Sequence, residues 1–111
     1  MVKWQGAAGI CLNEDNQLLM VLQGKKEEAK TWAVPSGGKE ANENFERCCI
    51  REVYEETGYV VDIVGEVLHK NNDAVEVHYF ETTITGGQMM IHAPDEIIYE
   101  IAWKQKLNYS I

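Results

Sequence analysis

The feature that most restricts the fold of this chain is a segment, residues 43–57, with the pattern of one amphipathic helix. Gly58 follows it and suits the left-handed position that ends many helices. Asn42 precedes it and is the expected N-cap. The flanking segments are rich in β-branched residues and partly alternate apolar with polar residues, which is typical of strands. One central helix between two sets of strands indicates an α/β (α+β) domain with a mixed β-sheet.

The expected strands lie on both sides of this helix. Residues 3–12 and 17–23 are predicted to pair as a hairpin across the turn Asn13-Glu14-Asp15-Asn16, and a short extended piece follows at Thr31-Trp32-Ala33-Val34-Pro35. Ser36-Gly37-Gly38 is expected to form a loop. After the helix, strands are expected at residues 59–70, 74–85 and 97–103. Trp32 has the ring to stack on a base, but a tryptophan beside a strand is more often in the core, and we assign it no ligand.

Length and composition exclude several classes of protein. At 111 residues the chain is expected to form a single domain, residues 1–111. It has no apolar run that would cross a bilayer and no persuasive secretory signal, so we expect a cytoplasmic protein. The net charge of -8 argues against nucleic acid as a main partner, although metal ions would still let an acidic protein bind phosphates. Cys11, Cys48 and Cys49 have neither disulfide nor zinc spacing and are predicted to be reduced and partly buried.

Three glutamates gather on one side of the predicted helix. At about 100° per residue, Glu52, Glu55 and Glu56 fall within an arc of roughly 100° beside the apolar positions Cys49 and Val53. Carboxylates at the edge of a buried face repel one another more strongly than solvated ones. A divalent cation would relieve this repulsion, and hard oxygen ligands suit Mg²⁺, with Mn²⁺ as a substitute. The alternative from the wheel alone is an ordinary exposed helix rich in glutamate.

The spacing around the helix favours the metal site. Gly37 is followed by five residues, Glu43, seven residues and then Arg51-Glu52-Val53-Tyr54-Glu55-Glu56-Thr57-Gly58-Tyr59. This pattern resembles the box of the Nudix hydrolase family, including MutT-like members. Only the last position, Tyr59 in place of an aliphatic residue, departs from it. The resemblance is specific over residues 37–59 and implies an α/β/α sandwich with a mixed sheet. It also implies metal-dependent hydrolysis of a nucleoside diphosphate linked to another group.

The resemblance also implies roles for individual residues. Glu52, Glu55 and Glu56 would be metal ligands and catalytic residues, with Glu52 and Glu56, one turn apart, the firmest ligands. Alternatively one of them, Glu52 by preference, would be the base that takes the proton from water, and the sequence does not separate these two roles. Gly37 would bring its carbonyl to the metal. Arg51, on the flank of the trio, would pair with Glu43 and hold the loop onto the helix. A late loop acid, Asp95 or Glu96, is a weaker candidate, and the spacing of His69, His78 and His92 suggests no shared metal.

The resemblance leaves the substrate open. Nucleoside triphosphates, nucleotide sugars, ADP-ribose, dinucleoside polyphosphates and capped or triphosphorylated RNA ends all fit the box, with the acidic charge disfavouring RNA. The alternatives to catalysis are a sensor that binds a nucleotide derivative and a purely structural cation site. The last eight residues are too short for the second helix that relatives place after the final strand. Either the chain is a truncated form or that sheet face is covered in another way, and we expect some tendency to self-associate, with a homodimer as one form of it.

Overall fold

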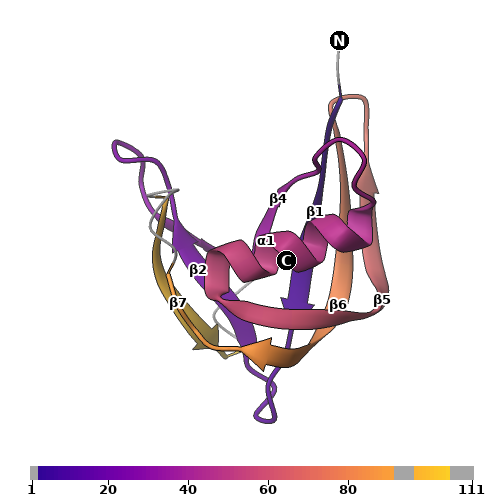
Figure 1. The fold of residues 1–111 in the computed structure, drawn as a ribbon. Coiled ribbons are helices and arrows are strands. Elements are labelled where there is room, and N and C mark those ends of the chain that lie inside the picture. The colour runs from indigo at the N-terminus through magenta and orange to yellow at the C-terminus, as the bar shows by residue number, and fades with distance from the viewer. Residues whose placement is uncertain (1–2, 92–96, 106–111) are drawn as a thin grey trace.

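The computed structural model describes residues 3–91 and 97–105, which form two β-sheets and one helix (Figure 1). The first sheet has the order β4-β1-β6-β5, and the second has the order β3-β2-β7. In the first sheet β1 pairs in parallel with β6 and antiparallel with β4. The expected mixed α/β fold is therefore confirmed, and one helical layer is present in the described part of the chain. The elements are β1 (Trp4–Cys11), β2 (Leu18–Gln23), β3 (Thr31–Ala33), β4 (Ser36–Gly38), α1 (Phe45–Thr57), β5 (Tyr59–Asn71), β6 (Val75–Gly87) and β7 (Ile98–Lys104).

The predicted hairpin between the first two strands is wrong. Only Leu12 and Leu18 form an isolated bridge at the turn, after which β1 and β2 enter different sheets. One edge of β1 pairs with β4 instead of β2, through residues Gly6 to Ala8. The residues expected to form a loop, Ser36 to Gly38, are the strand that makes this pairing. The first sheet thus fixes the backbone of Gly37.

Helix α1 begins two residues later than predicted. Asn44, and not Asn42, is the N-cap, since its side chain accepts a hydrogen bond from the backbone N–H of Arg47 at 2.7 Å. Asn42 has a φ of 67° and lies in a turn, in which the N–H of Glu40 donates to the carboxylate of Glu43. The predicted end is confirmed: Gly58 has a φ of 84°, and its N–H donates to the Tyr54 carbonyl.

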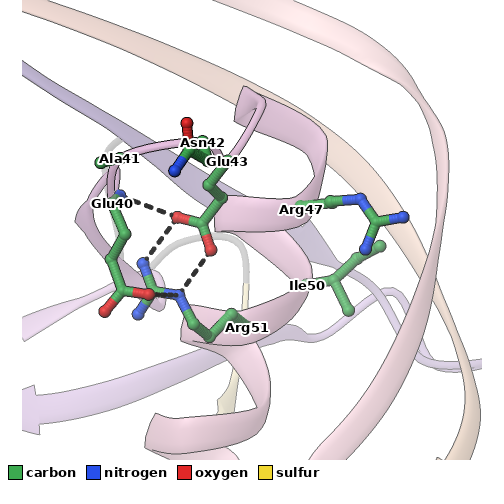
Figure 2. A pocket seen from close by; sticks show the side chains of 7 residues that line it. All are labelled: Glu40, Ala41, Asn42, Glu43, Arg47, Ile50 and Arg51. Atoms are coloured by element: carbon green, nitrogen blue, oxygen red, sulfur yellow. Dashed lines mark hydrogen bonds and ion pairs between the residues drawn. The ribbon is translucent and has the colours of Figure 1, made fainter.

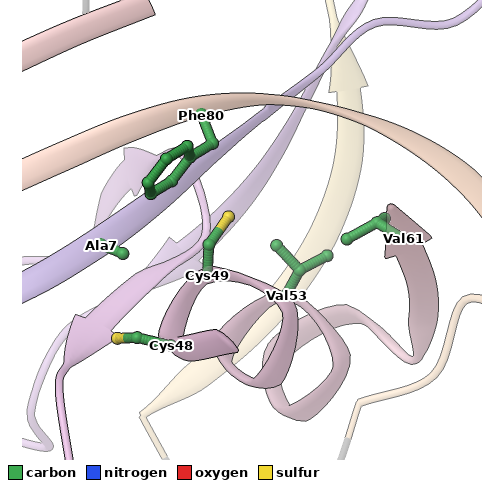
Figure 3. Packing of buried hydrophobic residues seen from close by; sticks show 6 residues of the cluster. All are labelled: Ala7, Cys48, Cys49, Val53, Val61 and Phe80. Carbon is green, nitrogen blue, oxygen red and sulfur yellow. The ribbon is translucent and has the colours of Figure 1, made fainter. Parts of the chain in front are cut away.

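The core forms where α1 packs on the first sheet (Figure 3). A β-carbon on Gly9 would lie 2.6 Å from Val53 Cγ2, so the helix can approach β1 closely only because this residue is glycine. All three cysteines are buried and free, as predicted. The packed set is Ala7, Cys48, Cys49, Val53, Val61 and Phe80.

The opposite side of the first sheet meets the second sheet. Ile10 from β1 packs with Leu18 and Met20 from β2, and Trp32 and Tyr79 lie against them partly buried. Trp32 is therefore at the edge of this core and not inside it. No helix in the described residues is long and apolar enough to span a bilayer.

Candidate active site

Arg51 joins the start of the site to the helix. Its Nε donates to Glu43 Oε2 at 2.7 Å and its Nη2 to Glu43 Oε1 at 2.9 Å, so the pair is bidentate (Figure 2). The same Nη2 donates to the Gly38 carbonyl at 2.8 Å. The predicted Arg51–Glu43 pair is therefore present, and it ties the turn before α1 and strand β4 to the second turn of the helix.

The charge of Arg51 strongly affects the ionisation of Glu43. Hydrogen bonds from the Arg51 guanidinium lower the pKa of Glu43 to about 2. Glu40 also approaches Arg51, at 3.5 Å, but its side chain is 68% exposed. Screening by water leaves such an exposed contact weak. Glu43 is therefore the partner that holds Arg51.

The pKa of Glu43 predicts how stability depends on pH. Because folding lowers this pKa from its ordinary value of 4.5 to about 2, its stabilising effect is complete above pH 4.5 and is lost as pH falls toward 2. Urea denaturation should show Glu43→Gln less stable than the wild type at pH 7, with a difference that shrinks between about pH 4.5 and 2.5. Glu40→Gln is the matched control and should track the wild type throughout. An equal gap at pH 7 and pH 3 would contradict this role for Glu43.

Arg51 also contacts two of the three clustered glutamates. Its Nη1 donates to Glu52 Oε1 and to Glu55 Oε1, both at 2.9 Å. The sequence predicted that Arg51 lies on the flank of the three glutamates. In the structure its guanidinium joins two of them, Glu52 and Glu55. One guanidinium cannot neutralise three carboxylates, so the cluster keeps an excess of negative charge.

The three carboxylates differ in burial. Glu56 is 5% exposed and accepts a hydrogen bond from the Ser36 N–H at 3.2 Å. The Glu52 side chain is 13% exposed, whereas that of Glu55 is 46% exposed. Burial, together with a hydrogen bond to Glu55, raises the pKa of Glu52 to about 7. The helix therefore holds a buried carboxylate, Glu56, and a largely buried one, Glu52, one turn apart, with Glu55 at the rim.

Gly37 lies directly against this cluster. A β-carbon at this position would overlap the Glu52 carboxylate, so only glycine allows β4 and α1 to approach this closely. The Gly37 carbonyl accepts a weak hydrogen bond from the Cys48 thiol at 3.4 Å. Gly37 is a strand residue that faces the candidate site, and it is not a turn glycine.

Replacing Gly37 by alanine should therefore disturb both the fold and the site. Displacing the Glu52 carboxylate is expected to cost about 1–3 kcal/mol in the free energy of unfolding. Gly65→Ala is the matched control, because a β-carbon there meets nothing within 4 Å. Thermal unfolding of both variants measures the effect. A Gly37→Ala variant as stable as Gly65→Ala would contradict the close approach.

Comparison with known proteins identifies the fold and the box. A family model described as NUDIX domain matches residues 3–104. The chain belongs to the Nudix family. "Putative 8-oxo-dGTP diphosphatase" of Bacillus subtilis (strain 168) is 38% identical over 88 residues, 78% of this chain and 57% of that protein. "Putative nudix hydrolase 1" of Caenorhabditis elegans is 33% identical over 105 residues, 92% of this chain and 28% of that protein. The chain thus spans less than two thirds of either relative.

Solved structures share this Nudix fold. A NUDIX hydrolase from Nitrosomonas europaea superposes with a TM-score of 0.79 at 20% identity, covering 96% of this chain and 75% of that one. An ADP-ribose pyrophosphatase from Streptococcus suis superposes with a TM-score of 0.76 at 18% identity, covering 94% of this chain and 75% of that one. These similarities establish the architecture around the Nudix box.

The remaining candidates from the sequence are the late loop acids and the histidines. Asp95, Glu96 and His92 lie outside the described residues. The sequence indicated no shared site for histidines, but the structure brings His69 and His78 together with Glu76. Sequence spacing missed this group because the pairing of β5 with β6 contains three register shifts.

Two pockets adjoin the Nudix box. The first, of about 650 Å³, lies beside the Arg51–Glu43 pair and is lined by Glu40 to Glu43, Arg47, Ile50 and Arg51 (Figure 2). The second, of about 230 Å³, contains three aromatic side chains, Trp4, Trp32 and Tyr79, and also includes Ser36. Ser36 connects this aromatic pocket with the site, because its N–H donates to the buried carboxylate of Glu56. Trp32 was the one member of this pocket that sequence reasoning singled out; the others could not be foreseen, since the lining comes from both sheets.

Proposed function

We propose that this Nudix domain hydrolyses the pyrophosphate linkage of a nucleoside diphosphate derivative with the help of a divalent metal. The observation that supports this most is the glutamate cluster on α1, with the buried Glu56 beside Ser36 and the partly buried Glu52 against Gly37. The printed name of the Bacillus subtilis relative, an 8-oxo-dGTP diphosphatase, agrees with this reaction class.

The residues of the box fit a hard divalent cation. Glu52, Glu55 and Glu56 offer carboxylate oxygens, and Gly37 offers a backbone carbonyl without an obstructing side chain. Oxygen donors of this kind suit Mg²⁺, with Mn²⁺ as a substitute. The raised pKa of Glu52 agrees, because it reflects a burial of charge that a cation would relieve. When bound, such an ion neutralises phosphate oxygens and lowers the pKa of a bound water.

The chain's own residues supply orientation and a proton acceptor. Glu52 is assigned as the base that takes the proton from the attacking water. Arg51 holds Glu52 and Glu55 in place from the side of Glu43, so it acts mainly as a positioning residue. The Ser36 N–H orients Glu56 from the opposite side.

The aromatic pocket supports a substrate with a nucleobase. Trp32 is half-buried there, with Lys104 Nζ 3.8 Å from its ring centre. Flat aromatic side chains bind a base by stacking. A base in this pocket would leave the phosphates beside Ser36 and Glu56, at the box.

A substrate panel tests the proposed function. The protein is incubated with nucleoside triphosphates (including 8-oxo-dGTP), ADP-ribose, a nucleotide sugar, a dinucleoside polyphosphate and inorganic pyrophosphate, with and without Mg²⁺. Chromatography should show cleavage of at least one nucleotide only with the metal, and slower turnover of pyrophosphate, which lacks a base. Binding without turnover would instead support the sensor function. A higher melting temperature with Mg²⁺, but neither nucleotide binding nor turnover, would support a structural cation site.

Cellular location and oligomeric state are the last two properties that we propose. We infer a cytoplasmic location and self-association as a homodimer. Exposed apolar side chains on β5, including Val64 at 57% and Val67 at 56% exposure, support self-association. Sedimentation of a clean monomer at micromolar concentration would contradict it.

A further inference from the structure

A second group of metal-ligand side chains lies outside the Nudix box, on the hairpin of β5 and β6. It consists of His69, Glu76 and His78, whose ligand atoms lie within 4.8 Å of one another. The His78 side chain is 14% exposed and that of Glu76 is 18% exposed, whereas His69 is more open at 38%. Two of the three are therefore held largely inside the protein and one stands at its surface.

Strand register explains why the three side chains converge. His69 is the cross-strand partner of His78, and their rings stack with centres 4.0 Å apart. Glu76 lies two residues before His78, so both side chains point to the same face of the sheet. Both imidazole Nε2 atoms face one oxygen, Glu76 Oε2, at 3.0 Å from His78 and 3.2 Å from His69.

These separations are close to those of a metal centre. With zinc-to-ligand distances of about 2.0–2.1 Å, ligand atoms at the corners of a tetrahedron lie about 3.4 Å apart. Small movements of exposed His69 would bring the three atoms to this spacing. Two histidines and one carboxylate are a known zinc donor set.

Surrounding residues already hold two of the three side chains, His78 and Glu76, in place. The Nδ1 of His78 faces Glu66, which leaves Nε2 as the ring's free ligand position. The Gln5 amide donates to Glu76 Oε1 at 2.9 Å, leaving Oε2 for the shared position. The ring of Phe45 packs on His78 with centres 3.9 Å apart. Outer hydrogen bonds of this kind orient metal ligands and strengthen binding.

We propose that His69, Glu76 and His78 form a binding site for Zn²⁺ or a similar transition-metal ion. Imidazole nitrogens favour such ions, whereas the carboxylates of the Nudix box favour Mg²⁺, so the two sites select different metals. The ion takes the lone pair of each Nε2, and any proton carried there is released to solvent, while Nδ1 of His78 stays toward Glu66. The ion links β5 to β6 beside Phe45, the first residue of α1.

The test measures zinc binding to the full chain with Mg²⁺ in excess, so that the Nudix box does not compete. Calorimetry should give one zinc site in the wild type. His69→Ala, chosen because this side chain is exposed, should weaken binding at least about 10-fold, and Glu66→Gln should also weaken it. The matched control is Glu81→Gln, which changes an exposed carboxylate of the same strand on the opposite face and should bind zinc like the wild type.

Nuclear magnetic resonance of the imidazole groups locates the ion without any activity measurement. Zinc should shift the Nε2 signals of both His69 and His78 in the wild type. The variants must first show wild-type circular dichroism in the absence of zinc. Equal zinc affinity in the wild type and His69→Ala, or unshifted Nε2 signals, would overturn the proposal.

Discussion

Replacing Glu56 with glutamine should reduce turnover at least about 100-fold while leaving the fold intact. Glutamine has nearly the same shape, and its side-chain oxygen still accepts the hydrogen bond from the Ser36 N–H. It lacks the negative charge that this buried position offers to a metal ion. The kcat on the best substrate of the panel measures the loss, and circular dichroism checks the fold.

Glu46→Gln is the control for this result. Glu46 has the same side chain, lies in the first turn of the same helix and is exposed. Its replacement should leave kcat within about 2-fold, because surface changes away from a site have small effects. Near-normal turnover of Glu56→Gln would refute the assignment of Glu56 to the site, whereas a loss in both variants would point to a general effect of charge on the helix.

Replacing Arg51 with lysine should lower the free energy of unfolding by about 2 kcal/mol, which is roughly 10 °C in Tm for a domain of this size. Arg51 makes a bidentate contact with Glu43, joins Glu52 to Glu55 and donates to the Gly38 carbonyl. Lysine keeps the charge but cannot make all of these contacts at once. Thermal and urea unfolding at neutral pH measure the loss.

Arg47→Lys is the matched control for this prediction. Arg47 is exposed on the same helix, and Figure 2 shows its guanidinium pointing away from the Arg51–Glu43 pair. The same chemical change there should alter stability by less than about 0.5 kcal/mol. An equal loss of unfolding free energy in the two lysine variants would show that the guanidinium contacts of Arg51 add no particular stability.

The grouping of the box glutamates on one side of the helix could be predicted from the sequence because it depends on local spacing. Glu52 and Glu56 are four residues apart, so any helix through them puts both on one side. The end at Gly58 was equally readable, since that position requires a left-handed residue. The start was less clear, because Asn42 and Asn44 both suit an N-cap and only the turn formed by Glu40 and Glu43 decides between them.

The sequence by itself determined the class of fold and the helix that carries the glutamates, and its resemblance to the Nudix box predicted the pairing of Arg51 with Glu43. Only the tertiary structure decided that β1 and β2 part into two sheets, that Trp32 lines a pocket beside Ser36, and that His69 meets His78. The physical reason is the range of the contacts. Helical neighbours follow from a fixed rise and turn along the chain, whereas strand partners depend on register and bulges set by residues far apart in sequence.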